Sequence, residues 1–347
     1  MREIFDDILT WEGSGRSFAL ARVVETWGSS PRRTGAAMIV GTGMEVAGSV
    51  SGGCIEGAVI TEAQAVLTDG TPRKLHYGVS DETAWSVGLT CGGEVSVFVE
   101  RHPGQAGGGS QEVWEALRTR LRENRPAVLL TRLASWECQH LLIDAEAPSV
   151  LAGEWGTATP AALAAAADAF SKKESEVVDV DDEPVFVHVF PCQARLLVVG
   201  ASHISIPLVR LAKVLGLETV VIDPREVFAR MERFPEPPGR LECVWPAKFF
   251  EAWPVDAGTY AVLLTHDPKI DDEALHHLLR SPAAYIGALG SRRSQAARVG
   301  RLREAGFTDS EIDRIHGPVG IDIGAESPEE IALSILAEVV AARRGAG

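Results

Sequence analysis

The stretch RLLVVGASHIS, residues 195–205, decides the fold of the second half of the chain. Its first part has the length and the Leu and Val content of a buried strand, a glycine follows, and helical sequence runs from 204 to 215. Further strands, each followed by helical sequence, are expected at 219–223, 261–265 and 284–289. Strands that alternate with helices predict a parallel sheet with helices on both faces.

The loop after the first of these strands starts at Gly200, where dinucleotide-binding folds carry G-x-G-x-x-G. Asp223 ends the next strand, a position suited to a ribose hydroxyl. Ser202 and Ser205 replace the second and third glycines, which hinders close approach of the backbone to a pyrophosphate, and His203 lies between them. Two interpretations stay open: a nucleotide contact, or a turn that Gly200 alone requires.

Polar clusters follow two other strands, and open parallel sheets bind ligands beyond the carboxyl ends of their strands. His266 could orient or protonate a ligand, or it could be a loop histidine bonded to Asp267 or to backbone. Ser291, Arg292 and Arg293 open a helix, where free N–H groups and guanidinium groups suit an anion. The alternative for this second cluster is a solvated basic turn.

Capping patterns predict two helices near the C-terminus. Ser327 is an expected N-cap, with Pro328 at the first helical position and Glu330 three residues after the cap. Thr308 and Glu311 form a similar pair before a short helix.

The first half of the chain is expected to be rich in strands. An amphipathic helix at 4–9 comes first, and Gly, Ser and Pro clusters separate the strands. Strands are expected at 18–25, 36–40, 45–50 and 95–99, a helix at 55–67, and a Gly-rich linker at 103–110. A middle block carries a helix at 112–122, strands at 127–133 and 140–143, an alanine-rich surface helix at 160–169, and a charged turn or linker at 179–183. We assign this block to the first domain, which predicts domains 1–190 and 191–347.

Two glycine-rich segments of the first domain carry thiols. Cys54 stands in GSVSGGCIE (48–56) at the expected start of a helix, where the helix dipole favours a thiolate, although Glu56 partly opposes this. Cys91 stands in GLTCGG (88–93), a turn where packing does not require cysteine. For both, the alternative is a small inert buried residue. Cys138, Cys192 and Cys243 lie in or beside strand sequence and are interpreted as structural.

A third segment, GSSPRRTG (28–35), offers hydroxyl groups, Arg32, Arg33 and flexible backbone between strands. Such a loop can wrap an oxyanion. The segment therefore adds a second candidate for anion binding.

Composition excludes several classes of protein. The chain has 347 residues, of which 46% are hydrophobic, and a formal net charge of -15. An acidic surface does not attract nucleic acid or anionic lipid, so an anionic ligand must be held locally. No apolar run reaches the roughly 20 residues of a membrane span, and the acidic N-terminus does not resemble a secretory signal. Five cysteines without a C-x-x-C pair fit reduced thiols in the cytosol.

Six stretches together resemble the XdhC/CoxI family. They are GSSPRRTGAAM, AGSVSGGCIEGAV, GLTCGGEVSVFVE, LTHDPKIDDEAL, YIGALGSRRS and GPVGIDIGAESPEEIALSILAEVVAARR. The resemblance implies an α/β protein with an N-terminal mixed α/β XdhC domain and a C-terminal Rossmann-like domain with a doubly wound parallel sheet. The family often has a second glycine where this chain has Ser202, which weakens the case for nucleotide contact there.

The resemblance also implies a function. Such a protein binds the molybdenum cofactor, as molybdopterin or its cytosine dinucleotide form, and protects it while a cysteine desulfurase helps to install its terminal sulfur. It then delivers the cofactor to a xanthine-dehydrogenase-like molybdenum hydroxylase, and it is expected to act as a homodimer and as a chaperone more than a catalyst.

The cargo has a phosphate, a flat pterin and a metal dithiolene, so its host needs an anion site and a cleft. We expect Cys91, with Cys54 as second choice, near the molybdenum or sulfur. Arg292 and Arg293 are expected at the phosphate, with Arg32 and the arginine after it as the next candidates.

Two other classes of function were weighed. An NAD(P)-dependent oxidoreductase would use Gly200 and Asp223 and would give His266 a role in proton transfer, but it leaves the cysteine motifs without a function. A regulatory interaction protein would need no pocket chemistry, and the concentration of Gly, Cys, His and Arg at turns argues against it.

Overall fold

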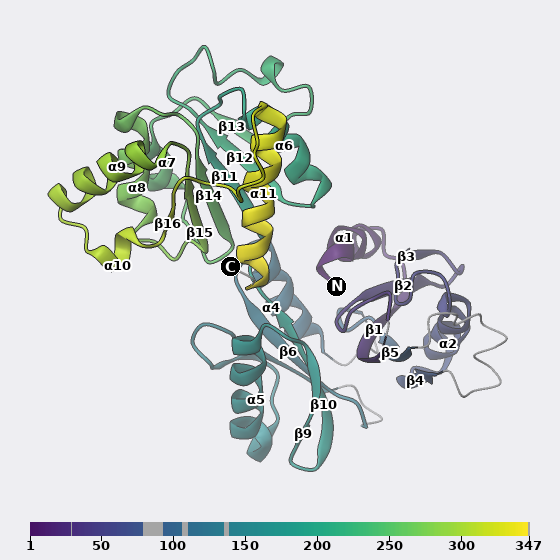
Figure 1. The fold of residues 1–347 in the computed structure, drawn as a ribbon. Helices are drawn as coiled ribbons and strands as arrows, with labels where there is room; N and C mark the ends of the chain where they lie inside the picture. The colour runs from purple at the N-terminus through teal and green to yellow at the C-terminus, as the bar shows by residue number, and fades with distance from the viewer. Residues whose placement is uncertain (29, 79–92, 106–109, 135–138, 346–347) are drawn as a thin grey trace. The chain divides into compact units, whose positions relative to one another are not determined.

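The computed structural model describes residues 1–28, 30–78, 93–105, 110–134 and 139–345. The chain divides into two compact units, Met1–Pro191 and Cys192–Gly347 (Figure 1). Within the described ranges, no helix is both long and apolar enough to cross a membrane. The assignment of residues 1–190 and 191–347 to two domains stays a prediction.

The second unit contains a fully parallel sheet of order β13-β12-β11-β14-β15-β16. This is the strand order of a Rossmann fold, and it confirms the predicted doubly wound α/β class. The strands are β11 (Arg195–Val199), β12 (Glu218–Ile222), β13 (Arg240–Glu242), β14 (Thr259–Leu263), β15 (Tyr285–Ala288) and β16 (Ile315–His316). The helices are α6 (Ser205–Val214), η3 (Met231–Arg233), α7 (Pro246–Ala252), α8 (Pro268–Leu278), α9 (Arg292–Glu304), α10 (Asp309–Ile312) and α11 (Pro328–Arg344).

Alternate residues of the central strand face two separate cores. Leu197 and Val199 pack in one cluster with apolar residues of α7, α8 and α9. Leu196 and Val198 pack in the other cluster with α6 and α11. Because side chains alternate along a strand, an unbroken apolar run buries both faces of a sheet.

Both predicted helix caps near the C-terminus are confirmed. Ser327 and Glu330 form a capping box at the start of α11, and Thr308 and Glu311 form one at the start of α10. Each cap satisfies two N–H groups that a helix N-terminus leaves without partners.

The first unit begins with an antiparallel sheet of order β3-β2-β1-β5-β4. Its α2 helix packs against one face of the sheet through an apolar stripe that includes Val59, Ala63 and Val66. The elements are η1 (Arg2–Ile4), α1 (Phe5–Gly13), β1 (Phe18–Trp27), β2 (Ala37–Gly41), β3 (Val46–Gly48), α2 (Glu56–Asp69), β4 (Arg73–Tyr77) and β5 (Glu94–Arg101).

A second antiparallel sheet in the same unit has the order β8-β7-β6-β10-β9. The elements are α4 (Gln111–Arg122), β6 (Ala127–Arg132), β7 (His140–Asp144), β8 (Val150–Ala152), η2 (Gly156–Ala158), α5 (Thr159–Lys172), β9 (Glu176–Val180) and β10 (Glu183–Phe190). The alanine-rich α5 is not only a surface helix, because Ala162, Ala166 and Ala169 are buried. The charged turn predicted at 179–183 is confirmed at its centre, where Asp181 and Asp182 join β9 to β10 in a tight hairpin, whereas the flanking residues belong to the two strands.

Candidate functional site

The loop 28–35 of the first unit connects β1 to β2 and lies against the loop that follows β3. The Arg32 Nε donates to the Ser49 carbonyl oxygen over 3.2 Å, and its Nη2 pairs with Glu3. Gly28 and Gly35 have φ values of 71° and 87°, which favour glycine. The structure thus brings together two of the segments that the sequence selects.

The loop 49–53 surrounds the Glu56 carboxylate. The backbone N–H groups of Val50, Ser51, Gly52 and Gly53 donate to it over 2.9–3.3 Å. The hydroxyl groups of Ser49, at 2.7 Å, and of Ser51 donate to it as well. Burial alone would raise the pKa of Glu56, but these hydrogen bonds outweigh it and lower the pKa to about 2. The loop is therefore a nest of N–H groups that holds an internal anion.

Cys54 lies at the end of this nest, two residues before the first residue of α2. It is a free, half-buried thiol, and its N–H donates to the Ser51 Oγ at 3.0 Å. Cys192 is half-buried and Cys243 exposed, whereas Cys91 and Cys138 lie outside the described residues. Of the two predicted functional thiols, the structure therefore places only Cys54.

A pocket of about 820 Å³ opens beside the loop 28–35. Four cationic side chains and two carboxylates line it: Arg2, Arg32, Arg33, Lys173, Glu3 and Glu174. A lining with an excess of positive charge is notable in a chain of net charge -15. This pocket is thus a place where the acidic protein can hold an anion.

His188 also lines this pocket, but sequence analysis did not select it. The ring is 4% exposed, and its Nδ1 has no hydrogen-bond partner within the described residues. Burial lowers the pKa of His188 well below its usual value, so the imidazole is neutral at pH 7. The Nε2 side of the ring faces Gly35, which lines the same pocket.

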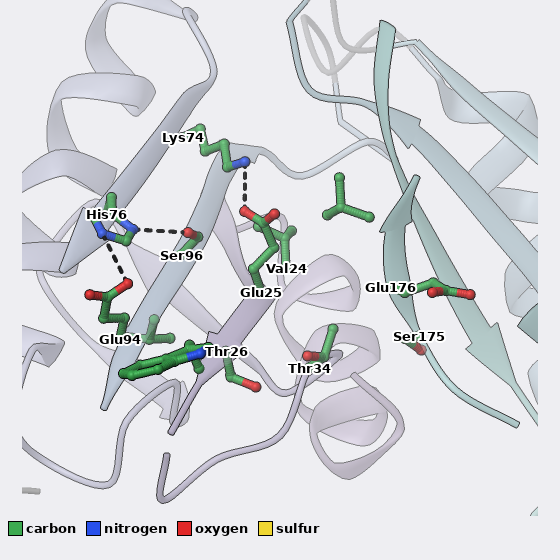
Figure 2. Close-up of a pocket in the computed structure, with 13 residues that line it drawn as sticks. Val24, Glu25, Thr26, Thr34, Lys74, His76, Glu94, Ser96, Ser175 and Glu176 are labelled. Atoms are coloured by element: carbon green, nitrogen blue, oxygen red, sulfur yellow. Dashed lines mark hydrogen bonds and ion pairs between the residues drawn. The ribbon is translucent and has the colours of Figure 1, made fainter. Parts of the chain in front are cut away.

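A neighbouring pocket of about 690 Å³ lies among β1, β4, β5 and the start of β9. Figure 2 shows the Lys74–Glu25 ion pair, 2.7 Å long, and His76 between Ser96 and Glu94. The His76 Nδ1 is 3.2 Å from the Ser96 Oγ. Sequence analysis named none of these residues as site residues, because β4 was not predicted.

A buried polar network crosses from the first sheet to the second within unit 1. The Arg22 Nη2 donates to the Glu100 Oε1 at 2.6 Å and to the Thr131 Oγ1 at 3.1 Å. The His140 Nε2 lies 2.9 Å from the other Glu100 oxygen. All four side chains are at most 3% exposed. This network is a structural feature, since removal of one partner would leave a buried charge unpaired.

In unit 2, the candidate residues gather at the carboxyl edge of the parallel sheet. Gly200 has a φ of 109°, and a Cβ at this position would lie 2.6 Å from the Thr265 Cγ2. A glycine is therefore required at the carboxyl end of β11 beside β14, where the strand order reverses and such sheets bind ligands. Ser202 is half-buried and His203 is exposed in the loop that follows.

Asp223 has no exposed surface, and both of its carboxylate oxygens already accept hydrogen bonds. The Ala201 N–H and the Arg225 Nη2 donate to Oδ2, and the Arg225 N–H and Nε donate to Oδ1. A ribose hydroxyl could bind Asp223 only if Arg225 moved away.

Asp271 of α8 links the loop after β14 to α9 through a hydrogen bond and an ion pair. The Thr265 Oγ1 donates to the Asp271 Oδ1 at 2.5 Å, and the Arg298 Nη2 lies 3.8 Å from the other Asp271 oxygen. Burial raises the pKa of Asp271. The Asp267 side chain caps α8, whereas His266 is exposed with a φ of 59°. The Asp267 carboxylate therefore bonds the start of its helix.

Ser291 is the N-cap of α9 and accepts a hydrogen bond from the Ser294 N–H. Arg292 and Arg293 are exposed in the first turn of this helix. The described ranges contain no group of His, Cys, Asp and Glu that could hold a metal ion.

Two segments of the chain match family descriptions. Residues 11–78 match the XdhC and CoxI family, and residues 196–339 match the XdhC Rossmann domain. The chain belongs to the XdhC and CoxI family. The first match contains the loop 28–35 and the Glu56 nest, and the second contains the carboxyl edge of the Rossmann sheet.

This XdhC and CoxI family chain is similar to three curated proteins over most of its length. The uncharacterized protein YqeB of Escherichia coli is 26% identical over 99% of the chain, which spans only 47% of YqeB. A Bacillus subtilis protein named as a probable subunit of xanthine dehydrogenase is 28% identical, with 94% of this chain and 93% of that protein covered. The molybdenum cofactor insertion chaperone PaoD of Escherichia coli is 27% identical, with 95% and 85% covered.

A crystal structure from Bacillus halodurans, described as a xanthine dehydrogenase, has a similar fold. It superposes with a TM-score of 0.74 at 28% identity and covers 99% of this chain and 96% of that one. The family fold therefore extends over the middle block of this chain, between the two matched segments.

Proposed function

We propose that this protein binds the molybdenum cofactor and inserts it into a molybdenum hydroxylase of the xanthine dehydrogenase type. Membership in the XdhC and CoxI family supports the proposal, as does the similarity to PaoD, whose name states cofactor insertion. The Bacillus subtilis relative, named as a probable subunit of xanthine dehydrogenase, supports the class of client.

The observation that carries the proposal is the cation-lined pocket beside the loop 28–35. The cofactor is a phosphate ester joined to a flat heterocycle, and a net charge of -15 repels it from most of the surface. Arg32 and Arg33 line a pocket of about 820 Å³, within the 300–1,000 Å³ typical of small-molecule sites. The acidic chain thus has a local place for an anionic cargo.

A thiol contacts the molybdenum or its sulfur in this proposal. Cys91 is the first candidate, because its glycine-flanked position has no packing explanation. Cys54 is the second candidate, because it is a free thiol beside the nest that holds Glu56. A soft thiolate is a suitable temporary ligand for a metal that must later be released.

The carboxyl edge of the Rossmann sheet is the second contact surface that we propose. Arg292 and Arg293 at the N-terminus of α9 would bind a phosphate, and Ser291 orients the first turn. Gly200 permits close approach where the strands diverge. The remaining proposed contacts at this edge are Ser202, His203, His266 and Asp267, together with Asp223 when Arg225 releases its carboxylate.

We also propose that the protein protects the cofactor during sulfuration, that a cysteine desulfurase is a transient partner, and that the protein is a homodimer. A carrier needs to bind and release its cargo without stabilising a transition state for hydride transfer. An NAD(P)-dependent oxidoreductase remains the alternative that the Rossmann strand order favours. The engagement of Asp223 by Arg225 and the serine at 202 disfavour it.

The test is anaerobic titration of the purified protein with molybdopterin and with its cytosine dinucleotide form, alongside NAD(P)H oxidation assays over a panel of carbonyl substrates. We expect saturable binding of one cofactor form and no turnover of NAD(P)H. Absence of cofactor binding, together with NAD(P)H oxidation that depends on substrate and on His266, would contradict the carrier function and favour the oxidoreductase.

A further inference from the structure

Two neighbouring pockets of unit 1 share part of their lining. The pockets of about 690 and 820 Å³ both include Thr26, Thr34 and Ser175, whose side chains carry hydroxyl groups. Figure 2 shows Thr34 and Ser175 on opposite sides of the space between the two sheets. A ligand too long for one pocket can therefore extend from one to the other across these three residues.

The larger pocket offers cations that no internal partner neutralises. Arg33 and Lys173 line it, and neither has an ion-pair partner within the described ranges, unlike Arg32. Arg33 and Lys173 can therefore pair with a phosphate.

The smaller pocket offers an aromatic surface and a carboxylate. Trp27 is 70% exposed and lies directly opposite Glu94 in the β1–β5 register. Within the described residues, the Glu94 carboxylate is paired with His76 at 3.9 Å, and Glu25 is paired with Lys74. An exposed indole can stack on a flat ring, and the neighbouring carboxylate can accept hydrogen bonds from the edge of that ring.

We infer that the two pockets form one site for a phosphorylated heterocycle with an amino-lactam edge, specifically a pterin. The 2-amino group and the adjacent ring N–H of such an edge are parallel donors that match the two oxygens of Glu94. The ring stacks on Trp27, and the phosphate lies at Arg33 and Lys173. This inference rests on the proposed function, and it places the pterin end of the cargo in unit 1.

Guanine has the same amino-lactam edge as a pterin, so the two ring systems must be compared directly. The probes are neopterin monophosphate, neopterin without phosphate, GMP and AMP, with binding measured by calorimetry or by pterin fluorescence anisotropy. We expect neopterin monophosphate to bind most tightly and AMP, which lacks the edge, not to bind. Tighter binding of GMP than of neopterin monophosphate would overturn the assignment to a pterin.

Variants separate the two ends of the site. Trp27→Ala and Glu94→Gln should each weaken neopterin monophosphate and neopterin by about 10-fold or more, because stacking or the pair of edge hydrogen bonds is lost. Arg33→Gln combined with Lys173→Asn should weaken only the phosphorylated probe, by about 10-fold. Asparagine is chosen because Lys173 has a φ of 56°, which Asn tolerates.

The matched controls are Trp245→Ala, which removes a 48% exposed tryptophan of unit 2, and the double variant Arg122→Ala with Arg125→Ala, which removes two exposed charges of unit 1. Both should bind the probes and molybdopterin as the parent does. If the parent binds molybdopterin but the site variants bind it equally well, this inference fails and the proposed function stands. If the parent binds neither molybdopterin nor any pterin, both fail.

Discussion

Replacement of Glu56 by glutamine tests whether the glycine-rich loop before α2 depends on an internal negative charge. The carboxylate accepts from four backbone N–H groups and two hydroxyl groups. Glutamine keeps the shape but removes the charge, and its NH₂ group would face donors. The loop should therefore lose part of the charge-assisted hydrogen bonding that stabilises its conformation.

The lowered pKa of Glu56 gives the size of the expected change in the free energy of unfolding. Hydrogen bonds lower the pKa of Glu56 from 4.5 to about 2, against the opposing effect of burial. A shift of this size would correspond to roughly 3 kcal/mol at about 1.4 kcal/mol per pH unit. Glu56 is partly exposed, and solvent screening reduces the contribution to about 1–2 kcal/mol. We expect Glu56→Gln to lower the free energy of unfolding by that amount at pH 7.

The effect has a defined pH dependence. Because the folded-state pKa is below the unfolded value, the carboxylate stabilises the fold above about pH 4.5, and this contribution is lost as the pH falls from about 4.5 to about 2. The difference between parent and variant should therefore narrow below pH 4.5. Urea unfolding followed by tryptophan fluorescence at pH 7, 5, 4 and 3.5 measures it. Trp245 and Trp253 are the only tryptophans of unit 2, so the signal reports mainly on unit 1.

Glu146→Gln is the control, since Glu146 is exposed and forms no ion pair within the described residues. It should leave the free energy of unfolding unchanged within about 0.5 kcal/mol. Equal stability of Glu56→Gln and the parent at pH 7, or a difference that stays constant down to pH 3.5, would refute the role of the charge.

Three further predictions concern the thiols, the Rossmann edge and the buried network. Cys91→Ala should leave the circular dichroism spectrum unchanged but lower client activity and molybdenum content after coexpression, whereas Cys54→Ala should have a smaller effect; unchanged client activity would return Cys91 to a structural role. Arg292→Ala with Arg293→Ala should weaken binding of the cytosine dinucleotide form, which has a second phosphate, by about 10- to 150-fold at matched ionic strength, and equal affinity would exclude these arginines as contacts. Glu100→Gln should lower the free energy of unfolding by about 3–5 kcal/mol in urea titrations, since Arg22 would stay buried beside a neutral amide; a loss below 1 kcal/mol would contradict this.

The parallel-sheet unit was predictable because its signals are local. Leu196 to Val199 form an apolar run of strand length, and Ser327 with Glu330 is a complete capping box in sequence. Such signals depend on neighbours within four residues, so tertiary contacts do not override them.

Several strands of the first unit gave no such signal. The β4 strand is a five-residue edge strand, RKLHY, whose only aliphatic residue is Leu75, and β10 contains Pro184 near its start, which argues against a strand in sequence. These segments form strands because β4 pairs with β5 and β10 pairs with β6, which are distant from them in sequence. Because β4 was missed, so was the pocket that contains His76 and Glu94.

The candidate site was predictable only where its residues give a local sequence signal. The loop 28–35 and the nest before α2 stand out by composition, but their contact through Arg32 and Ser49 depends on the β2–β3 pairing. The internal occupant of the nest, Glu56, was interpreted from sequence only as a charge that opposes a thiolate. His188 gives no sequence signal, because its neighbours in β10 are ordinary strand residues.

The central claim is that the protein passes a bound molybdenum cofactor to a client, and transfer tests it most directly. The protein is loaded anaerobically with the cofactor form that it binds, freed of excess by gel filtration, and mixed with a cofactor-free molybdenum hydroxylase. We expect molybdenum to move to the hydroxylase in parallel with recovered activity, faster than from the same amount of free cofactor. Retention of the molybdenum by the loaded protein, or recovery no faster than with free cofactor, would contradict it.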